Sequence, residues 1–112
     1  MTYRIEVTET AQRDVAEAYQ WLLERTPQHA PAWLDGLAAA WESLSEMPNR
    51  CPRAPEADEV KEDVRQLLHG KKGGVYRILF MFRDRTVFIL HVRHGARQPL
   101  KKGEFGFPPG RP

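Results

Sequence analysis

Hydrophobic and polar residues alternate at the start of the chain, where polar neighbours separate Tyr3, Ile5 and Val7. A period of two is typical of a β-strand that buries one of its faces. We therefore expect a short strand over residues 2–7.

The apolar period then lengthens to that of a helix. Apolar positions recur at i, i+4, i+7, i+8 and i+11, which places them on one helical stripe that Thr8 or Thr10 can cap. A second stripe follows, and Pro27 and Pro48 end the two segments. Because the connection is short, the pattern predicts an antiparallel helical hairpin. The two stripes are formed by Ala11, Val15, Ala18, Tyr19 and Leu22, and by Ala30, Trp33, Leu34, Leu37, Trp41 and Leu44.

Residues 47–63 carry prolines among charged residues, a composition that disfavours both a helix and a central strand. We expect this segment to be a surface loop. Beyond it, the runs "VRQLLH", "VYRILFMF" and "TVFILHVR" are separated by the turn signals "GKKGG" and "RDR". They predict three strands in an antiparallel meander, whose middle strand is central because nearly all its positions are apolar.

These elements together predict an α+β domain. An N-terminal strand, an antiparallel helical hairpin and an antiparallel three-stranded meander follow one another, with the hairpin packed on one sheet face. A chain of 112 residues suits a single domain, which we expect to span residues 1–100. Residues 101–112 are rich in glycine and proline, and we expect them to form an irregular, frayed tail.

The register of the last two strands decides which basic side chains share a face. If Asp84 and Arg85 form a two-residue turn, Tyr76 and Arg93 lie on one face and Arg77 projects from the other. A three-residue turn instead places Arg77 beside Arg93. Because a slip of one residue exchanges the two faces, both arrangements stay open.

The composition of the chain indicates where the protein acts and which kinds of site it can hold. No apolar run approaches the roughly 18 to 20 residues that a membrane span requires, and the N-terminus lacks the basic and apolar segments of an export signal. We therefore expect a soluble, cytoplasmic protein. Cys51 is the only cysteine, which excludes an internal disulfide and the usual zinc ligand sets, so we expect no metal and no other cofactor.

The net charge of +2 conceals an uneven distribution. Residues 1–60 hold 5 Lys/Arg and 11 Asp/Glu, a net −6, whereas residues 61–112 hold 12 and 4, a net +8. A basic half can attract phosphate or an acidic protein segment, and solvated surface charge is the simpler alternative. Arg93, His94 and Arg97 cluster directly after an apolar strand, which is a rigid mount for charged groups.

The stretch "VRQLLHGKKGGVYRILFMFRDRTVFILHVRHGARQPL", residues 64–100, resembles the C-terminal half of the RelE/ParE superfamily of type II toxin–antitoxin toxins. The matching features are an Arg-x-Leu strand, a Gly-bounded turn, a Tyr-Arg-Ile-Leu strand, an apolar hairpin and a His-x-x-Arg segment after the last strand. A strand and a helical hairpin precede it in the same order as in that family, so the resemblance covers residues 3–100.

This resemblance implies a small cytoplasmic toxin that arrests growth and is held inactive by a labile antitoxin encoded beside it. RelE-like members cut mRNA in the ribosomal A site, and ParE-like members poison DNA gyrase. We expect a cognate antitoxin as partner, with the ribosome and its mRNA or DNA gyrase as target, and no membrane partner. A ribosome-dependent endoribonuclease is slightly favoured, because that reaction gives the basic cluster a chemical use.

The resemblance also points to individual residues. RelE-like ribonucleases carry basic side chains at positions that match Arg77 and Arg97, and some members place a catalytic histidine near His94. Cleavage through the RNA 2′-hydroxyl requires a proton acceptor, a proton donor and cations near the phosphate. We therefore assign His94 as acid/base and the two arginines as phosphate clamps, and we expect alanine at either arginine to abolish growth arrest without disturbing the fold. Secondary contacts to nucleic acid or partner are expected from Arg65, Lys71, Lys72, Tyr76 and Arg93.

Some features favour other interpretations. Several RelE-like enzymes also use a C-terminal Tyr or a Glu, but here no tyrosine follows Tyr76. Phe105 can stack on a base but cannot transfer a proton, and Glu104 lies in the expected tail. The helical hairpin and the histidine past the last strand also resemble ParE-like toxins. A non-catalytic module that only binds the antitoxin is a third interpretation, and Tyr76 can be a packed strand aromatic.

Overall fold

The computed structural model describes residues 2–71, 74–105 and 107, and its centre is a four-stranded sheet with the order β1-β4-β3-β2. β1 runs parallel to β4, and the other neighbouring strands run antiparallel. This sheet and the helices described next confirm the predicted α+β architecture. The strands are β1 (Arg4–Val7), β2 (Arg65–His69), β3 (Tyr76–Arg83) and β4 (Thr86–His94).

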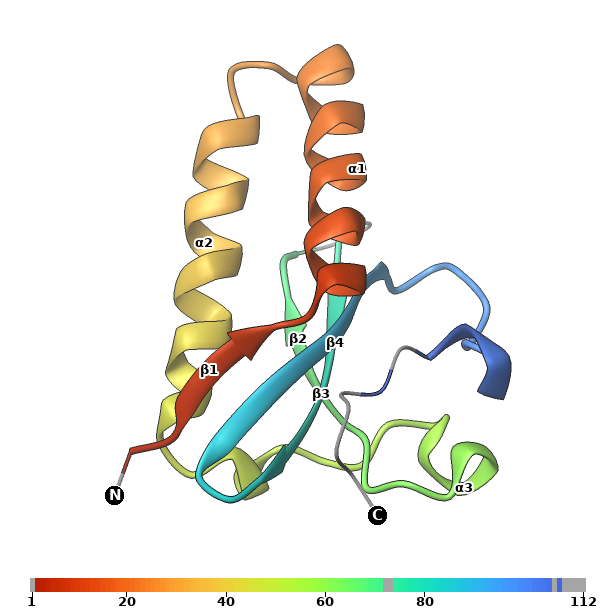
Figure 1. Ribbon diagram of the computed structural model, residues 1–112. Helices are drawn as coiled ribbons and strands as arrows, with labels where there is room; N and C mark the ends of the chain where they lie inside the picture. The colour runs from red at the N-terminus through yellow and green to blue at the C-terminus, as the bar shows by residue number, and fades with distance from the viewer. Residues whose placement is uncertain (1, 72–73, 106, 108–112) are drawn as a thin grey trace.

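Two helices form the predicted antiparallel hairpin, α1 (Glu9–Arg25) and α2 (Ala30–Glu42), and they cover one face of the sheet (Figure 1). Thr8 caps α1, because its Oγ1 accepts a hydrogen bond from the Ala11 amide at 3.2 Å. In the described residues, no helix combines the length and the apolar character that a membrane span needs. The core between hairpin and sheet includes Ala11, Leu37, Leu44, Ile78, Phe80, Val87, Ile89 and Val92.

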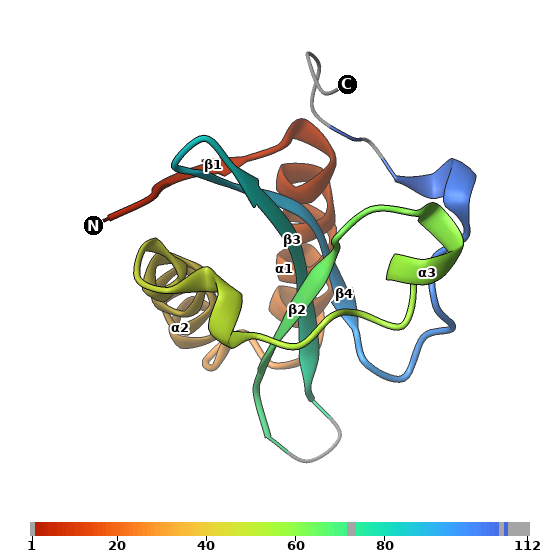
Figure 2. The same cartoon turned by 90° about the horizontal axis from the view of Figure 1, so that it is seen from below.

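The other face of the sheet is covered by two segments that were expected to be irregular. Figure 2 shows α2 and α3 (Ala57–Val60) on opposite sides of the sheet. The segment expected as a surface loop also holds a 3₁₀ turn, Pro48–Arg50, and the chain beyond β4 forms another, Lys102–Glu104. These segments bury apolar side chains against the sheet face that the hairpin leaves open. This second cluster contains Ala54, Ala57, Val60, Val64, Leu79, Met81, Leu90 and Leu100, with Phe88, Phe105 and Phe107 packed on it.

The β3–β4 hairpin combines features of both arrangements considered above. Asp84 and Arg85 do form a two-residue turn, with φ of 49° and 65°, which are values of a hairpin turn with both central residues left-handed. Between that turn and the strand ends, however, a β-bulge shifts the register, so that Leu90 faces no partner on β3. Arg77 therefore pairs with Arg93, and Tyr76 pairs with His94. The arrangement expected from a three-residue turn is reached through the bulge instead.

The backbone conformation at position 70, directly after β2, requires a glycine. Its φ is +118°, and a Cβ at this position would collide with the carbonyl oxygen of Gly74. We expect Gly70→Ala to lower the free energy of unfolding by about 2 kcal/mol in urea denaturation. Gly103→Ala is the matched control, because a Cβ there meets no atom within 4 Å. Equal stability of the two variants would contradict this strain.

Candidate functional site

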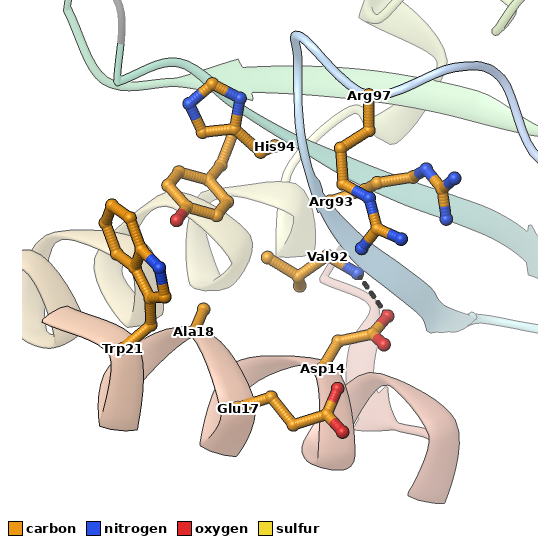
Figure 3. Close-up of a pocket in the computed structure, with 9 residues that line it drawn as sticks. Asp14, Glu17, Ala18, Trp21, Val92, Arg93, His94 and Arg97 are labelled. Carbon is orange, nitrogen blue, oxygen red and sulfur yellow. Dashed lines mark hydrogen bonds between the residues drawn. The ribbon is translucent and has the colours of Figure 1, made fainter.

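A cavity of about 450 Å³ lies between α1 and the C-terminal end of β4 (Figure 3). Its walls come from three parts of the chain that the fold brings together: one face of α1, the paired ends of β3 and β4, and the turn after β4. The lining residues are Asp14, Glu17, Ala18, Trp21, Tyr76, Val92, Arg93, His94 and Arg97.

The cavity carries opposite charges on facing walls (Figure 3). Asp14 and Glu17 project from α1, while Arg93 and Arg97 project from the strand end and the turn beyond it. Burial, and then the charge of Arg97, lower the pKa of Arg93 from its ordinary value. The Arg93 Nε donates a hydrogen bond to the Gln98 carbonyl oxygen at 3.1 Å, which holds the turn against the strand. Two arginines close together in this way favour an anionic group from a ligand.

His94 lines the cavity, and a backbone hydrogen bond holds its ring. The amide of Ala96 donates a hydrogen bond to Nδ1 of His94 at 3.0 Å, so this nitrogen carries no proton in the arrangement. The ring meets Tyr76 edge-on at 5.2 Å between centroids, and Tyr76 in turn meets Trp33 at 5.1 Å. Burial raises the pKa of Tyr76. Because the Ala96 amide occupies the Nδ1 lone pair, His94 can accept a proton at Nδ1 only by giving up this backbone hydrogen bond.

Arg77 does not join the cavity. It projects from the other sheet face, where Nη1 and Nη2 bind the two carboxylate oxygens of Glu56 at 2.9 and 2.5 Å. Its Nε donates to Gln66 Oε1 at 2.9 Å, and its side chain is only 9% exposed. The structure therefore does not bring Arg77 together with Arg97, because the Arg77 guanidinium is engaged inside the protein.

Glu56 is the residue that engages Arg77, and its carboxylate is wholly buried. Besides Arg77, it accepts a hydrogen bond from the Leu100 amide at 3.0 Å, so it connects three segments: the proline-rich segment, β3 and the chain beyond β4. Burial acts to raise the pKa of Glu56, but the hydrogen bonds from Arg77 and Leu100 outweigh it and leave the pKa below its usual value. Glu56 is therefore an ionised structural anchor.

The other residues predicted to contact nucleic acid or a partner lie in different parts of the structure. Tyr76 and Arg93 line the cavity, whereas Arg65 on the edge strand donates to the Cys51 and Asn49 carbonyl oxygens at 2.7 and 3.2 Å. Lys71 is exposed in the turn after β2. Lys72 lies outside the described residues.

Sequence reasoning missed the α1 wall. Asp14 Oδ2 accepts a hydrogen bond from the Val92 amide at 3.0 Å. This bond gives a partner to a backbone amide of β4 that lies beyond the end of its pairing with β1. Trp21 is 50% exposed, and the Arg25 guanidinium stacks 4.2 Å from its ring centroid. Within the described residues, no group of His, Cys, Asp and Glu side chains is arranged to hold a metal ion.

Comparisons with known proteins agree with this fold. The family model described as the ParE toxin of the type II toxin–antitoxin system parDE matches residues 5–99. A solved chromosomal ParDE system from P. aeruginosa is similar in fold, with a TM-score of 0.69 and 17% identity over 83% of this chain and 96% of that chain.

A second solved structure, the toxin–antitoxin complex RelBE2 from Mycobacterium tuberculosis, has a TM-score of 0.53 and 26% identity over 84% of this chain and 99% of that chain. No curated protein sequence matches. The family match covers most of the chain and agrees with both structural likenesses. The chain therefore belongs to the ParE toxin family of type II toxin–antitoxin systems, within the RelE/ParE superfamily.

Proposed function

We propose that this toxin acts in the cytoplasm by binding DNA gyrase, as the resemblance to ParE-like members implies, and that it does so without catalysing a reaction of its own. The observation that carries the proposal is the buried ion pair between Arg77 and Glu56. It removes one of the three side chains that a RelE-like cleavage of mRNA would use. A cognate antitoxin is the partner that holds the toxin inactive.

The rest of the expected ribonuclease site is also poorly suited to proton transfer. The Nδ1 lone pair of His94 is occupied by the Ala96 amide. The Glu104 carboxylate accepts a hydrogen bond from the Lys101 amide at 2.7 Å, and Phe105 packs edge-on against His91. General acid–base catalysis needs a donor and an acceptor within reach of the reacting hydroxyl. Among the described residues, the cavity offers charge and apolar surface more readily than such a pair.

The cavity instead suits a segment of a protein partner. Its arginines can bind a carboxylate, its acidic wall can bind a cationic side chain, and Trp21 and Val92 can contact an apolar group between them. Aromatic and arginine side chains of this kind dominate the energy of many protein interfaces. We propose Arg97, Arg93 and Tyr76 as contacts to gyrase or to the antitoxin.

One observation supports the alternative of a ribosome-dependent endoribonuclease. His94, Arg93 and Arg97 do meet at a single cavity, and cations beside a histidine can bind a phosphate and stabilise the charge that develops on it. This alternative requires His94 to exchange its hydrogen bond with Ala96 for one to the substrate.

Two parallel assays of the purified chain distinguish these functions. We expect the chain to inhibit supercoiling of relaxed plasmid by gyrase, because the cavity provides a surface for protein binding. In a cell-free translation reaction, primer extension should find the mRNA intact. The supercoiling assay without gyrase and the mRNA without ribosomes are the controls. Ribosome-dependent cuts within codons, together with unaffected supercoiling, would replace the gyrase proposal with the endoribonuclease.

A further inference from the structure

His91 on β4 is buried between two hydrogen-bond acceptors. Its Nδ1 lies 2.8 Å from the Asp14 Oδ2 of α1, and its Nε2 lies 2.8 Å from the carbonyl oxygen of Glu104. The residue is 6% exposed, so water does not readily replace either partner. The two contacts join the first helix, the sheet and the chain beyond the sheet through one ring.

The chemistry of imidazole makes this arrangement depend on protonation. A neutral ring carries one N–H and one lone pair, whereas the imidazolium carries two N–H donors. A carbonyl oxygen and an ionised carboxylate oxygen both lack a proton to donate. Only the imidazolium satisfies both contacts. In the neutral ring, the proton stays beside the Asp14 carboxylate, and the Nε2 lone pair then faces the carbonyl oxygen of Glu104.

The Glu104 contact holds a segment that we call the C-terminal strap, residues 101–105 and 107. The ring of Phe105 meets the His91 ring edge-on, at 5.5 Å between centroids, and stacks on Phe107 at 5.3 Å. Both phenylalanines pack on the second core cluster, which includes Leu90 of the sheet. The strap therefore covers apolar surface, and its polar attachment to the sheet runs through His91.

We propose that protonation of His91 fastens the C-terminal strap to the sheet, and that loss of the Nε2 proton releases it. This proposal is independent of whether the toxin acts on gyrase or on the ribosome. Asp14 lines the cavity as well as binding His91, so the state of the strap is linked to the acidic wall of the cavity.

Charged groups lie around His91 and at the start of the strap. Asp14 faces His91 from α1 at hydrogen-bond distance, and Arg93, two residues along β4, lies near Asp14 and Glu104. The Glu104 carboxylate is turned to the Lys101 amide within the strap. Glu56 anchors Leu100 just before the strap, and its lowered pKa keeps this anchor ionised through neutral pH. Release therefore begins after Leu100 and follows a rise in pH.

The test is NMR on the full chain between pH 5 and 9, which follows the His91 Cε1–H shift and the NOE between the His91 and Phe105 rings. We expect the NOE at low pH and its loss as the ring becomes neutral. The ratio of docked to released strap should fall by up to about tenfold for each pH unit, since one proton is involved.

His91→Gln should abolish the pH dependence of the strap signals, whereas His29→Gln, at an exposed position between the helices, should leave it unchanged. Core signals of Ile78 and Phe80 report whether each variant is folded. Persistence of the NOE after the His91 ring has become neutral would overturn the proposal. The same pH-dependent release in a folded His91→Gln variant would do so too, because another group would then be responsible.

Discussion

Replacing Glu56 with glutamine should lower the free energy of unfolding by about 3 to 5 kcal/mol, the usual cost of breaking a buried ion pair. The substitution preserves the shape of the side chain but leaves the buried Arg77 guanidinium without its counter-charge. It also weakens the acceptor of the Leu100 amide, so the chain beyond β4 loses an anchor. Urea denaturation at pH 7, followed by tryptophan fluorescence, measures the change.

The matched control is Asp58→Asn, on the short helix α3 that Glu56 precedes. The Asp58 side chain is 90% exposed and pairs with Arg53 at 3.1 Å, so its loss should cost less than about 1 kcal/mol. A double variant, Glu56→Leu with Arg77→Met, should recover much of the stability, because it removes both buried charges together. Equal losses of unfolding free energy for Glu56→Gln and Asp58→Asn would show that the buried ion pair contributes no more to stability than the exposed one.

The same pair determines the acid limit of stability. Because the folded-state pKa of Glu56 is lowered, its contribution is fully present above the unfolded-state pKa and is lost as pH falls through the folded-state value. Stability of the native chain should therefore decline on acidification below the ordinary range of a glutamate. Glu56→Gln should show a flatter decline over that pH window.

The regular elements were predictable because they follow from periodicity. The stripe beginning at Ala11 and the alternation from Tyr3 to Val7 are local properties, and the hydrophobic effect acts on them wherever the partner surface lies. The register was not predictable, because the bulge at Leu90 depends on how β4 meets both of its neighbours. A shift of one residue then decided that Arg93, and not Val92, lies opposite Arg77.

The site was predictable only in part for the same reason. His94, Arg97 and Arg93 were found because they cluster after a strand, and a strand end fixes their position. The acidic wall was missed, although Asp14 and Trp21 stand at helical spacing from Ala18 and mark a second stripe of α1. Such a stripe becomes informative only once the packing of the helix against β4 is known.

The structures of the proline-rich segment and of the chain beyond β4 were the least predictable from the sequence. A high content of glycine and proline indicates only that a helix or a central strand is disfavoured. The structure that these segments adopt depends instead on tertiary contacts with residues far away in the sequence. Glu56 meets Arg77 across 21 positions and the Leu100 amide across 44. No local pattern encodes those contacts.

Replacing Arg97 with alanine should abolish growth arrest while leaving the fold intact. Its side chain is exposed at the cavity, and no hydrogen bond or ion pair of the described structure requires the guanidinium. Truncation should therefore change the free energy of unfolding by less than about 0.5 kcal/mol. An arginine at the centre of an interface contributes about 2 kcal/mol or more, which corresponds to a loss of about thirtyfold in affinity for the target.

Growth after induction, combined with a melting curve of the purified variant, measures both effects. Arg13→Ala is the control, because Arg13 is also an exposed arginine, on α1, paired only with Glu9 at 3.6 Å. Arg77→Ala should lose growth arrest as well, but with a lowered melting temperature, because Arg77 pairs with the buried Glu56; this revises the expectation that alanine at Arg77 leaves the fold undisturbed. Full growth arrest by a well-folded Arg97→Ala variant would place the target contact elsewhere. Loss of growth arrest in Arg97→Ala together with full arrest in Arg13→Ala would identify the cavity as the toxic surface, because both residues are exposed arginines and only Arg97 lines the cavity.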